Sequence, residues 1–243
     1  MVWQLLGYSM IPMTIMGMTG AAAAWREPDP RLRSAVLHLA AGVIFAVVAV
    51  EFLPDLMREH AGTQTAIGFV VGTIAMLGFR SLSRRAEEKA QGLETEGRSL
   101  PLVLLFATGV DLAIDGLMLG IAFTAGRKEG VMLTLALAIE LGSVGLAIAA
   151  ALQDRGIQRG RAVLVVCGLA LLFGFTASAG GLILPGLSGD AWATLLAFGS
   201  AALLFLVTEE LLTEAHEIPE NPLLTAAFFL GFITLFLIDM LNG

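Results

Sequence analysis

Long apolar stretches, separated by short polar segments, make up most of this chain. A membrane-spanning helix needs roughly 20 mostly apolar residues, and the sequence contains eight stretches of about that length. They are rich in Leu, Ala, Gly and Phe and are longer than the roughly 10-residue strands of a membrane barrel. The pattern therefore predicts an all-α integral membrane protein, with eight transmembrane helices in a single domain of residues 1–243. The predicted helices cover residues 3–24, 34–57, 62–81, 100–125, 130–152, 161–184, 190–213 and 221–241.

The composition excludes several classes of protein. Hydrophobic residues make up 57% of the chain and charged residues 14%, whereas an average globular chain is about 25% charged. A soluble domain or a disordered chain would need more polar residues. The single cysteine excludes a disulfide scaffold and a cysteine-rich metal site. The net charge of −7 comes without a basic patch, so nucleic acid is excluded as a partner and a lipid bilayer is expected around the helices.

Basic residues predict how the chain is oriented in the membrane. The regions in and beside the first, third, fifth and seventh loops hold 11 Lys and Arg residues, and those of the other loops hold three. Since cytoplasmic loops are enriched in Lys and Arg, the odd-numbered loops are predicted to be cytoplasmic and both termini to lie outside. The longest loop, residues 83–99, is polar and is predicted to be a flexible cytoplasmic connector. Short loops without extra domains suit a multi-pass protein of a bacterial inner membrane.

Three carboxylates stand in the middle of apolar runs. Asp111 and Asp115 are four residues apart in the run 100–125, so a helix places them on one face. Asp111 and Glu140 lie ~16 Å and ~15 Å from the starts of their helices, near the middle of a ~30 Å hydrocarbon core. An ionised side chain there costs about 2.5–3.5 kcal/mol on the insertion scale. Because every Lys and Arg lies in or beside a loop, we expect these acids either to hold a divalent cation or to be protonated and hydrogen-bonded to backbone.

Two similar acidic segments end two of the other runs. The run 34–57 contains Glu51-Phe-Leu-Pro-Asp55, and the run 190–213 leads into Glu210-Leu-Leu-Thr-Glu214. The two runs are predicted to cross in opposite directions, which places the segments at opposite membrane faces. This arrangement is typical of inverted-repeat transporters, which bind substrate near the midplane; the alternative is that acids simply end helices near water. The transporter interpretation predicts that Glu51 and Asp55 recruit cations outside. It predicts an inner cluster that receives them, formed by Glu209, Glu210, Glu214 and His216.

Four segments resemble the ZIP (Zrt/Irt-like) family of divalent-metal transporters. AAGVIFAVVAVEFLPDL resembles the second helix of that family, which ends in H-L-L-P-E, with Glu51 in the His position. DLAIDGLMLGIAF resembles the motif H-N-x-x-[DE]-G, with Asp111 in place of His and Leu112 in place of Asn. AIELGSVGLAIAAAL matches E-L-G in the motif H-E-x-P-H-E-L-G-D, where Ser143 replaces the final Asp. EELLTEAHE is similar to E-E-L-L-P-E-A-H, with Thr213 in place of Pro.

The resemblance implies a 3+2+3 arrangement, in which two inverted three-helix repeats surround the helices 100–125 and 130–152. It implies alternating access by a rocking or elevator-like motion, and transport of Zn²⁺, Mn²⁺, Fe²⁺ or Cd²⁺ into the cytoplasm. Since the family's imidazole ligands are missing, we expect one metal, held by Asp111, Asp115 and Glu140, with Ser143, backbone or water completing its shell. Loss of nitrogen ligands shifts the preference towards harder ions such as Mn²⁺. The metal is cargo, so neither a resident cofactor nor enzymatic activity is expected.

Two other functions fit the sequence. A ZIP-fold protein that has lost metal transport, and acts as a scaffold or binding protein, would explain the missing His and Asn ligands. A proton-coupled carrier of another cation would use the same carboxylates as a proton relay. Whichever holds, the spacings Gly68-x-x-x-Gly72 and Gly116-x-x-x-Gly120 allow close helix packing, and so a homodimer.

Overall fold

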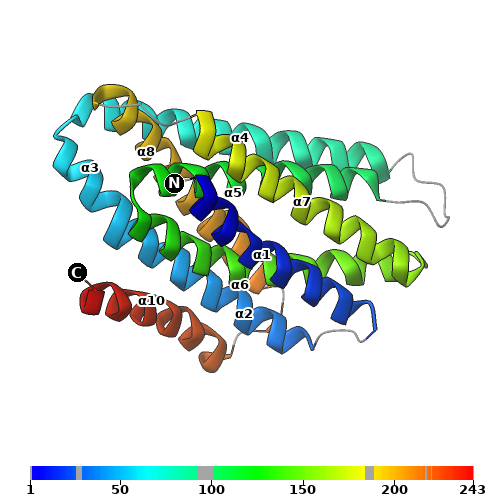
Figure 1. The fold of residues 1–243 in the computed structure, drawn as a ribbon. Helices are drawn as coiled ribbons and strands as arrows, with labels where there is room; N and C mark the ends of the chain where they lie inside the picture. Colours follow the sequence, from blue (N-terminus) through cyan, green and yellow to red (C-terminus); the bar gives the residue numbers. More distant parts are fainter. Residues whose placement is uncertain are drawn as a thin grey trace.

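The computed structural model describes residues 2–25, 29–91, 101–183, 189–216, 218–219 and 221–242. Within these residues the chain is all-helical and has no strand (Figure 1). Two π-helical segments, η1 (Val48–Phe52) and η2 (Leu206–Leu211), interrupt the α-helices. The α-helices are α1 (Val2–Ala23), α2 (Pro30–Val47), α3 (Leu53–Glu59), α4 (Gly62–Gln91), α5 (Leu102–Ala125), α6 (Arg127–Asp154), α7 (Arg159–Ile183), α8 (Gly189–Phe205), α9 (Leu212–Ala215) and α10 (Pro222–Asn242). The predicted all-α class is confirmed.

Seven helical segments of the described chain are long and apolar enough to cross a membrane. They match the second to eighth predicted runs. The first predicted run also forms a helix, α1, but α1 is not among these seven, so the predicted total of eight spans stays a prediction. The seven segments are Pro30–Glu59, Gly62–Leu82, Leu104–Ala125, Arg127–Asp154, Arg159–Ile183, Gly189–Ala215 and Pro222–Leu241.

The predicted connector 83–99 is in part helical. Helix α4 runs on to Gln91, beyond the predicted end at residue 81, and residues 92–99 lie outside the described residues. The segment RRAEEKAQ (84–91) explains the extension, because Arg, Ala, Glu, Lys and Gln are all strong helix formers. The prediction rested on polarity, which marks the end of an apolar run but not the end of a helix.

Two of the seven segments contain a π-helical turn. In one, α2 continues through η1 into α3; in the other, α8 continues through η2 into α9. The N–H of the residue after each turn, Leu53 or Leu212, bonds to the carbonyl five residues earlier, as a π-helix requires. Each turn ends one residue after a glutamate of the predicted acidic clusters, Glu51 or Glu210. Single π-helical turns inside α-helices are frequent at functional sites.

Glycines bring four pairs of helices into close contact. The pairs are α1 with α6, α5 with α7, α4 with α8, and α2 with α10. A Cβ on Gly116 of α5 would lie 2.5 Å from the carbonyl oxygen of Phe173 on α7. Glycines of α4, at positions 68 and 72, likewise lie against carbonyl oxygens of α8. Both predicted Gly-x-x-x-Gly pairs therefore pack inside the chain, and the homodimer to which they were linked stays a prediction.

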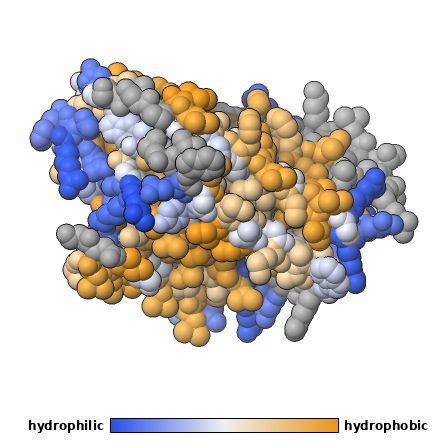
Figure 2. Space-filling view, in the orientation of Figure 1, coloured by the Kyte–Doolittle hydropathy of each residue, from blue (hydrophilic) through white to orange (hydrophobic). Residues whose placement is uncertain are grey.

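The outer helices carry exposed apolar side chains. On α4, Ile74 is 63% exposed, and on α10, Phe229 is also 63% exposed. Figure 2 shows hydrophobic residues across the middle of one face of the molecule, with hydrophilic residues gathered towards its two ends. The central helices α5 and α6 are joined at Gly126, whose extended backbone ends one helix and begins the next. This tight turn holds α5 and α6 side by side, and they carry the candidate site.

Candidate metal-binding site

Three carboxylates of the two central helices meet in the interior of the bundle. Asp111 and Asp115 come from α5 and Glu140 comes from α6, and one carboxylate oxygen of each lies within 4.8 Å of the others. Asp115 is 2% exposed and Glu140 is 1% exposed, whereas Asp111 is partly exposed. The structure thus brings together the three acids that the sequence predicts to converge.

Glycines behind the carboxylates fix the two helices that carry them. Gly116, next to Asp115, lets α5 lie against the backbone of α7. On α6, Gly145 serves the same purpose towards α1, because a Cβ there would lie 2.4 Å from the carbonyl oxygen of Met16. Both helices are therefore held from the outside by backbone contacts. The three acids extend from a rigid support, which favours a site of defined geometry.

Two oxygens of the site receive no hydrogen bond from the described residues. Asp115 Oδ2 and Glu140 Oε2 are both buried without a donor. Ser143 is buried too, but its hydroxyl donates to the backbone oxygen of Glu140 at 2.7 Å, so it offers only lone pairs to the site. None of the ion pairs of the described chain involves the three carboxylates. Buried acceptors of this kind need a proton or a cation.

Glu210 adds a fourth carboxylate to the cluster. It lies in the π-helical turn η2, and its side chain is within hydrogen-bonding reach of Asp111. It also interacts electrostatically with Asp115 and Glu140. The sequence predicts Glu210 on the inner part of the pathway, separate from the central acids. The structure places it beside Asp111 of α5, at the edge of the central site.

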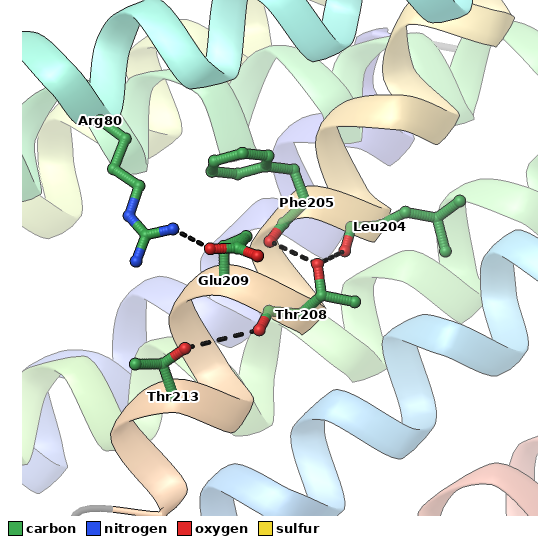
Figure 3. Close-up of polar contacts among 6 residues, drawn as sticks. All are labelled: Arg80, Leu204, Phe205, Thr208, Glu209 and Thr213. Carbon is green, nitrogen blue, oxygen red and sulfur yellow. Dashed lines mark hydrogen bonds and ion pairs between the residues drawn. The ribbon is translucent and has the colours of Figure 1, made fainter.

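Two other acids of the inner cluster are paired with arginines. Glu209 forms an ion pair with Arg80 of α4, and Figure 3 shows this pair beside the threonines of η2 and α9. Thr208 donates to the carbonyl oxygen of Leu204 at 2.9 Å, which satisfies a backbone group where the helix changes its pattern. Glu214, one turn beyond Glu210, pairs with Arg33 of α2. Glu214 also interacts electrostatically with Asp111 and Glu140 of the central site.

Two histidines meet next to this inner cluster. The ring of His216 is exposed and packs edge-on against the ring of His38, with centroids 5.0 Å apart. His38 is 3% exposed; its Nδ1 donates to the backbone oxygen of Ser34 at 2.8 Å, and its Nε2 is buried without a hydrogen-bond partner among the described residues. From the sequence alone His38 is one more polar residue at the start of an apolar run. The missed signal is the spacing of four from Ser34, which places both on one helix face.

The two acids that the sequence predicts to recruit cations outside, Glu51 and Asp55, have separate partners. Asp55 pairs with Arg58, one turn further along α3, at 2.9 Å. Glu51 is buried in η1 and lies 3.6 Å from the ammonium of Lys128, which is 2.5 Å from Asp239 of α10. Sequence reasoning missed both partners of Glu51. It expected Lys128 in a loop, but α6 begins at Arg127 instead of residue 130, and this places Lys128 in its first turn.

The donor set of the central site is made of oxygen alone. Carboxylates suit hard divalent cations such as Mn²⁺, Mg²⁺ or Ca²⁺, whereas imidazole and thiolate ligands favour Zn²⁺ and softer ions. Three or four carboxylates around one point can hold a divalent cation, or they can exchange it for protons. No protein-family model matches the sequence, and no curated protein shows a significant match.

Proposed function

We propose that this chain is a multi-pass membrane protein of ZIP-like architecture, which carries a divalent metal cation across the membrane into the cytoplasm. Asp111, Asp115 and Glu140 bind the metal, and Glu210 passes it on towards the inner end of the bundle. The observation that carries the proposal is the convergence of three interior carboxylates, two of them with buried oxygens that no described residue hydrogen-bonds. Isolated structural acids seldom gather in this way, because each adds to the repulsion on the others.

The pairing of helices supports an internal repeat, which is the basis of alternating access. If α1–α4 correspond to α7–α10, and α5 to α6, exchanging the halves converts the pair α1 with α6 into α7 with α5. It likewise converts the pair α4 with α8 into α10 with α2. These four pairs make the most extensive contacts of the bundle. The π-turns correspond as well, since their glutamates, Glu51 and Glu210, are 159 positions apart.

Two glycine contacts support the same correspondence. Gly72 of α4 lies against the carbonyl oxygen of Phe198 on α8, and Gly231 of α10 lies against that of Leu39 on α2. The two glycines are 159 positions apart in the sequence, and so are Phe198 and Leu39. A chance likeness between two five-residue segments would not extend to a backbone contact on another helix. The recurrence of this spacing in a backbone contact supports two related halves with similar packing.

The surface of the bundle supports the membrane location. The apolar side chains of α4 and α10 are too numerous for a water-facing surface, where contiguous apolar patches are small. In the segments Gly62–Leu82 and Pro222–Leu241, only 17% and 11% of the residues of the most apolar window are buried within the chain. Lipid is the surrounding that suits them. The direction of transport, towards the cytoplasm, comes from the family resemblance and not from the site.

Metal uptake into proteoliposomes tests the proposal. Purified protein is reconstituted, and uptake of Mn²⁺, Fe²⁺, Zn²⁺ and Cd²⁺ is compared between wild type and Asp115→Asn/Glu140→Gln. These substitutions keep the size of both side chains and remove their charges. We expect saturable uptake with Mn²⁺ or Fe²⁺ ahead of Zn²⁺, and its loss in the double variant. Asp154→Asn is the matched control, because Asp154 is an exposed acid at the far end of the same helix, α6, and should keep wild-type uptake.

Each other result has a definite meaning. Absence of uptake for all four metals, from protein shown to be folded by its thermal unfolding in detergent, would contradict metal transport and favour a scaffold or binding role. Metal uptake that is unchanged in the double variant would contradict the site. Uptake of an organic cation that is inhibited by none of the metals would favour a proton-coupled carrier of that cation.

A further inference from the structure

The outer π-turn holds a pair of acids bridged by one lysine. Glu51 is 5% exposed, and its Oε1 receives no hydrogen bond from the described residues. The Lys128 ammonium lies 3.6 Å from this oxygen. The same ammonium lies 2.5 Å from an oxygen of Asp239. Glu129 adds a further negative charge nearby. The three groups of the bridge come from three separate elements, η1, α6 and α10.

The packing of α2 and α10 brings the two acids together. Gly42 of α2 lies against Phe228 and Phe232 of α10, and Gly231 lies against Leu39 and Val43 of α2. The contacting backbones place residue 42 near residue 230, and parallel helices then place η1 beside the last turns of α10. Asp239 is only partly exposed in this position, at 20%. Two carboxylates set against each other repel, and a cation between them removes the repulsion.

Lys128 is suited to leaving this position. Its side chain is 38% exposed, whereas that of Glu51 is 5% exposed. It lies in the first turn of α6, just after the single-residue turn at Gly126. A lysine ammonium is a strongly hydrated charge on a flexible four-carbon stem, so it exchanges readily between the acids and water. The acids, in contrast, are fixed to packed helices.

We infer that Glu51 and Asp239 form a second cation-binding site, in which the ammonium of Lys128 is a tethered competitor for the incoming metal. The inference rests on the proposed function for its role in uptake. A divalent cation displaces Lys128 because it neutralises both carboxylates, whereas the ammonium neutralises one. Monovalent ions lack this advantage, so the lysine raises the selectivity for divalent ions at the outer end. It also keeps the site closed when metal is scarce.

Substitutions on the two sides of this bridge should have opposite effects. Lys128→Gln removes the competitor, and we expect it to lower the metal concentration for half-maximal uptake several-fold. Asp239→Asn removes one ligand of the cation, and Lys128 can still pair with Glu51. It should therefore raise that concentration several-fold. Lys128→Arg keeps the positive charge and so, unlike Lys128→Gln, should not lower that concentration. A purely structural tie between α6 and α10 would give weaker uptake and lower stability for both Lys128→Gln and Asp239→Asn, and this result would overturn the inference.

Binding of Mn²⁺ separates this inference from the proposed function. In the Asp115→Asn/Glu140→Gln background the central site is removed, and bound Mn²⁺ is counted by electron paramagnetic resonance on the whole protein in detergent. We expect one remaining site, tightened several-fold by Lys128→Gln and abolished by Glu51→Gln or Asp239→Asn. If no Mn²⁺ binds in that background, or if Lys128→Gln leaves the affinity unchanged, the second site is wrong even where wild type transports metal. If wild type transports no metal but this binding and its lysine dependence are found, the second site stands and the proposed function falls.

Discussion

The two π-helical turns of the bundle each hold a glutamate of the recurring acidic motif, and the two glutamates have different electrostatic surroundings. Beside Glu210, the peripheral helix α4 supplies a cation, Arg80, which pairs with Glu209 of η2 (Figure 3). Beside Glu51, the peripheral helix α10 supplies an anion, Asp239. The cation there is Lys128, which comes from α6. Arg80 and Asp239 are 159 positions apart, as are the two glutamates. The backbone framework is therefore alike at the two turns, and the charge at the corresponding position is reversed.

In the proposed transporter, this reversal of charge makes the surroundings of Glu51 and Glu210 different, although both lie in similar π-helical turns. The side chain of Glu210 interacts with that of Asp111, one of the three central carboxylates. Glu51 faces a lysine and a second acid instead, and no described contact joins it to the central site. An exact repeat would give both ends the same affinity for a cation. In the proposed transporter, the side chains at these few positions make the ends unequal, while the paired helices and π-turns give the two halves similar packing.

The largest expected effect comes from neutralising one π-turn glutamate at a time. Glu210→Gln should lower the maximal rate of metal uptake at least about tenfold, which corresponds to about 1.4 kcal/mol of barrier, because it removes the fourth carboxylate of the central site. Glu51→Gln should raise the half-saturating concentration and leave the maximal rate nearly intact, because Glu51 binds the cation before it reaches the central site. Uptake kinetics in proteoliposomes give both quantities for both variants.

The two substitutions are matched, since each removes one charge from a π-turn without changing the size of the side chain. Their comparison is the sharpest test of the two-ended arrangement. Equal losses of maximal rate in the two variants would contradict it, and would place Glu51 in contact with the central site.

The fold follows largely from features that the sequence displays. Runs of about 20 apolar residues predict the long helices of the described chain, with boundaries that shift by a few residues. The apolar pattern does not predict the extension of α4 to Gln91, because polarity marks the end of an apolar run and not the end of a helix. The π-turns have no sequence signal of their own, because η1 and η2 continue apolar, helix-forming segments. Only the recurring motif around Glu51 and Glu210 marks the two places as related.

The central site is more predictable than its surroundings. The spacing of Asp111 and Asp115 and the depth of Glu140 are properties of single helices joined by a short turn, so the sequence carries them. The contacts of Lys128 with Asp239, and of Glu210 with Asp111, join residues about 100 positions apart. They depend on which helices pack together, and a single sequence does not contain that information.

A second prediction concerns the glycine contacts that hold the outer helices. A Cβ at position 231 would lie 2.3 Å from the oxygen of Leu39, and one at position 72 would lie 2.8 Å from that of Phe198. Gly231→Ala should therefore lower the free energy of unfolding by about 1–3 kcal/mol, the usual cost of overpacking, and Gly72→Ala should lower it by less. Unfolding of the purified protein in detergent measures both. Gly78→Ala is the control, because a Cβ at Gly78 meets no atom within 4 Å.

The glycine variants test the helix contacts that the two halves share, and not the charges at their π-helical turns. Both Gly231→Ala and Gly72→Ala should lose stability relative to Gly78→Ala, in that order. If both variants match the control, the close contacts of α10 with α2 and of α4 with α8 do not exist, and the correspondence between the halves loses its strongest support.

The smallest expected effect is at the inner ion pair. The side chains of Arg80 and Glu209 are 45% and 42% exposed, and exposed pairs of this kind contribute about 0–1 kcal/mol. Arg80→Gln should therefore lower stability by less than about 1 kcal/mol, and the loss should shrink at high salt, because solvent ions screen exposed charges. A double-mutant cycle with Glu209→Gln, measured by unfolding in detergent at low and high salt, isolates the pair. A salt-independent coupling well above this range would contradict this expectation and would mean that Arg80 is held in a buried contact.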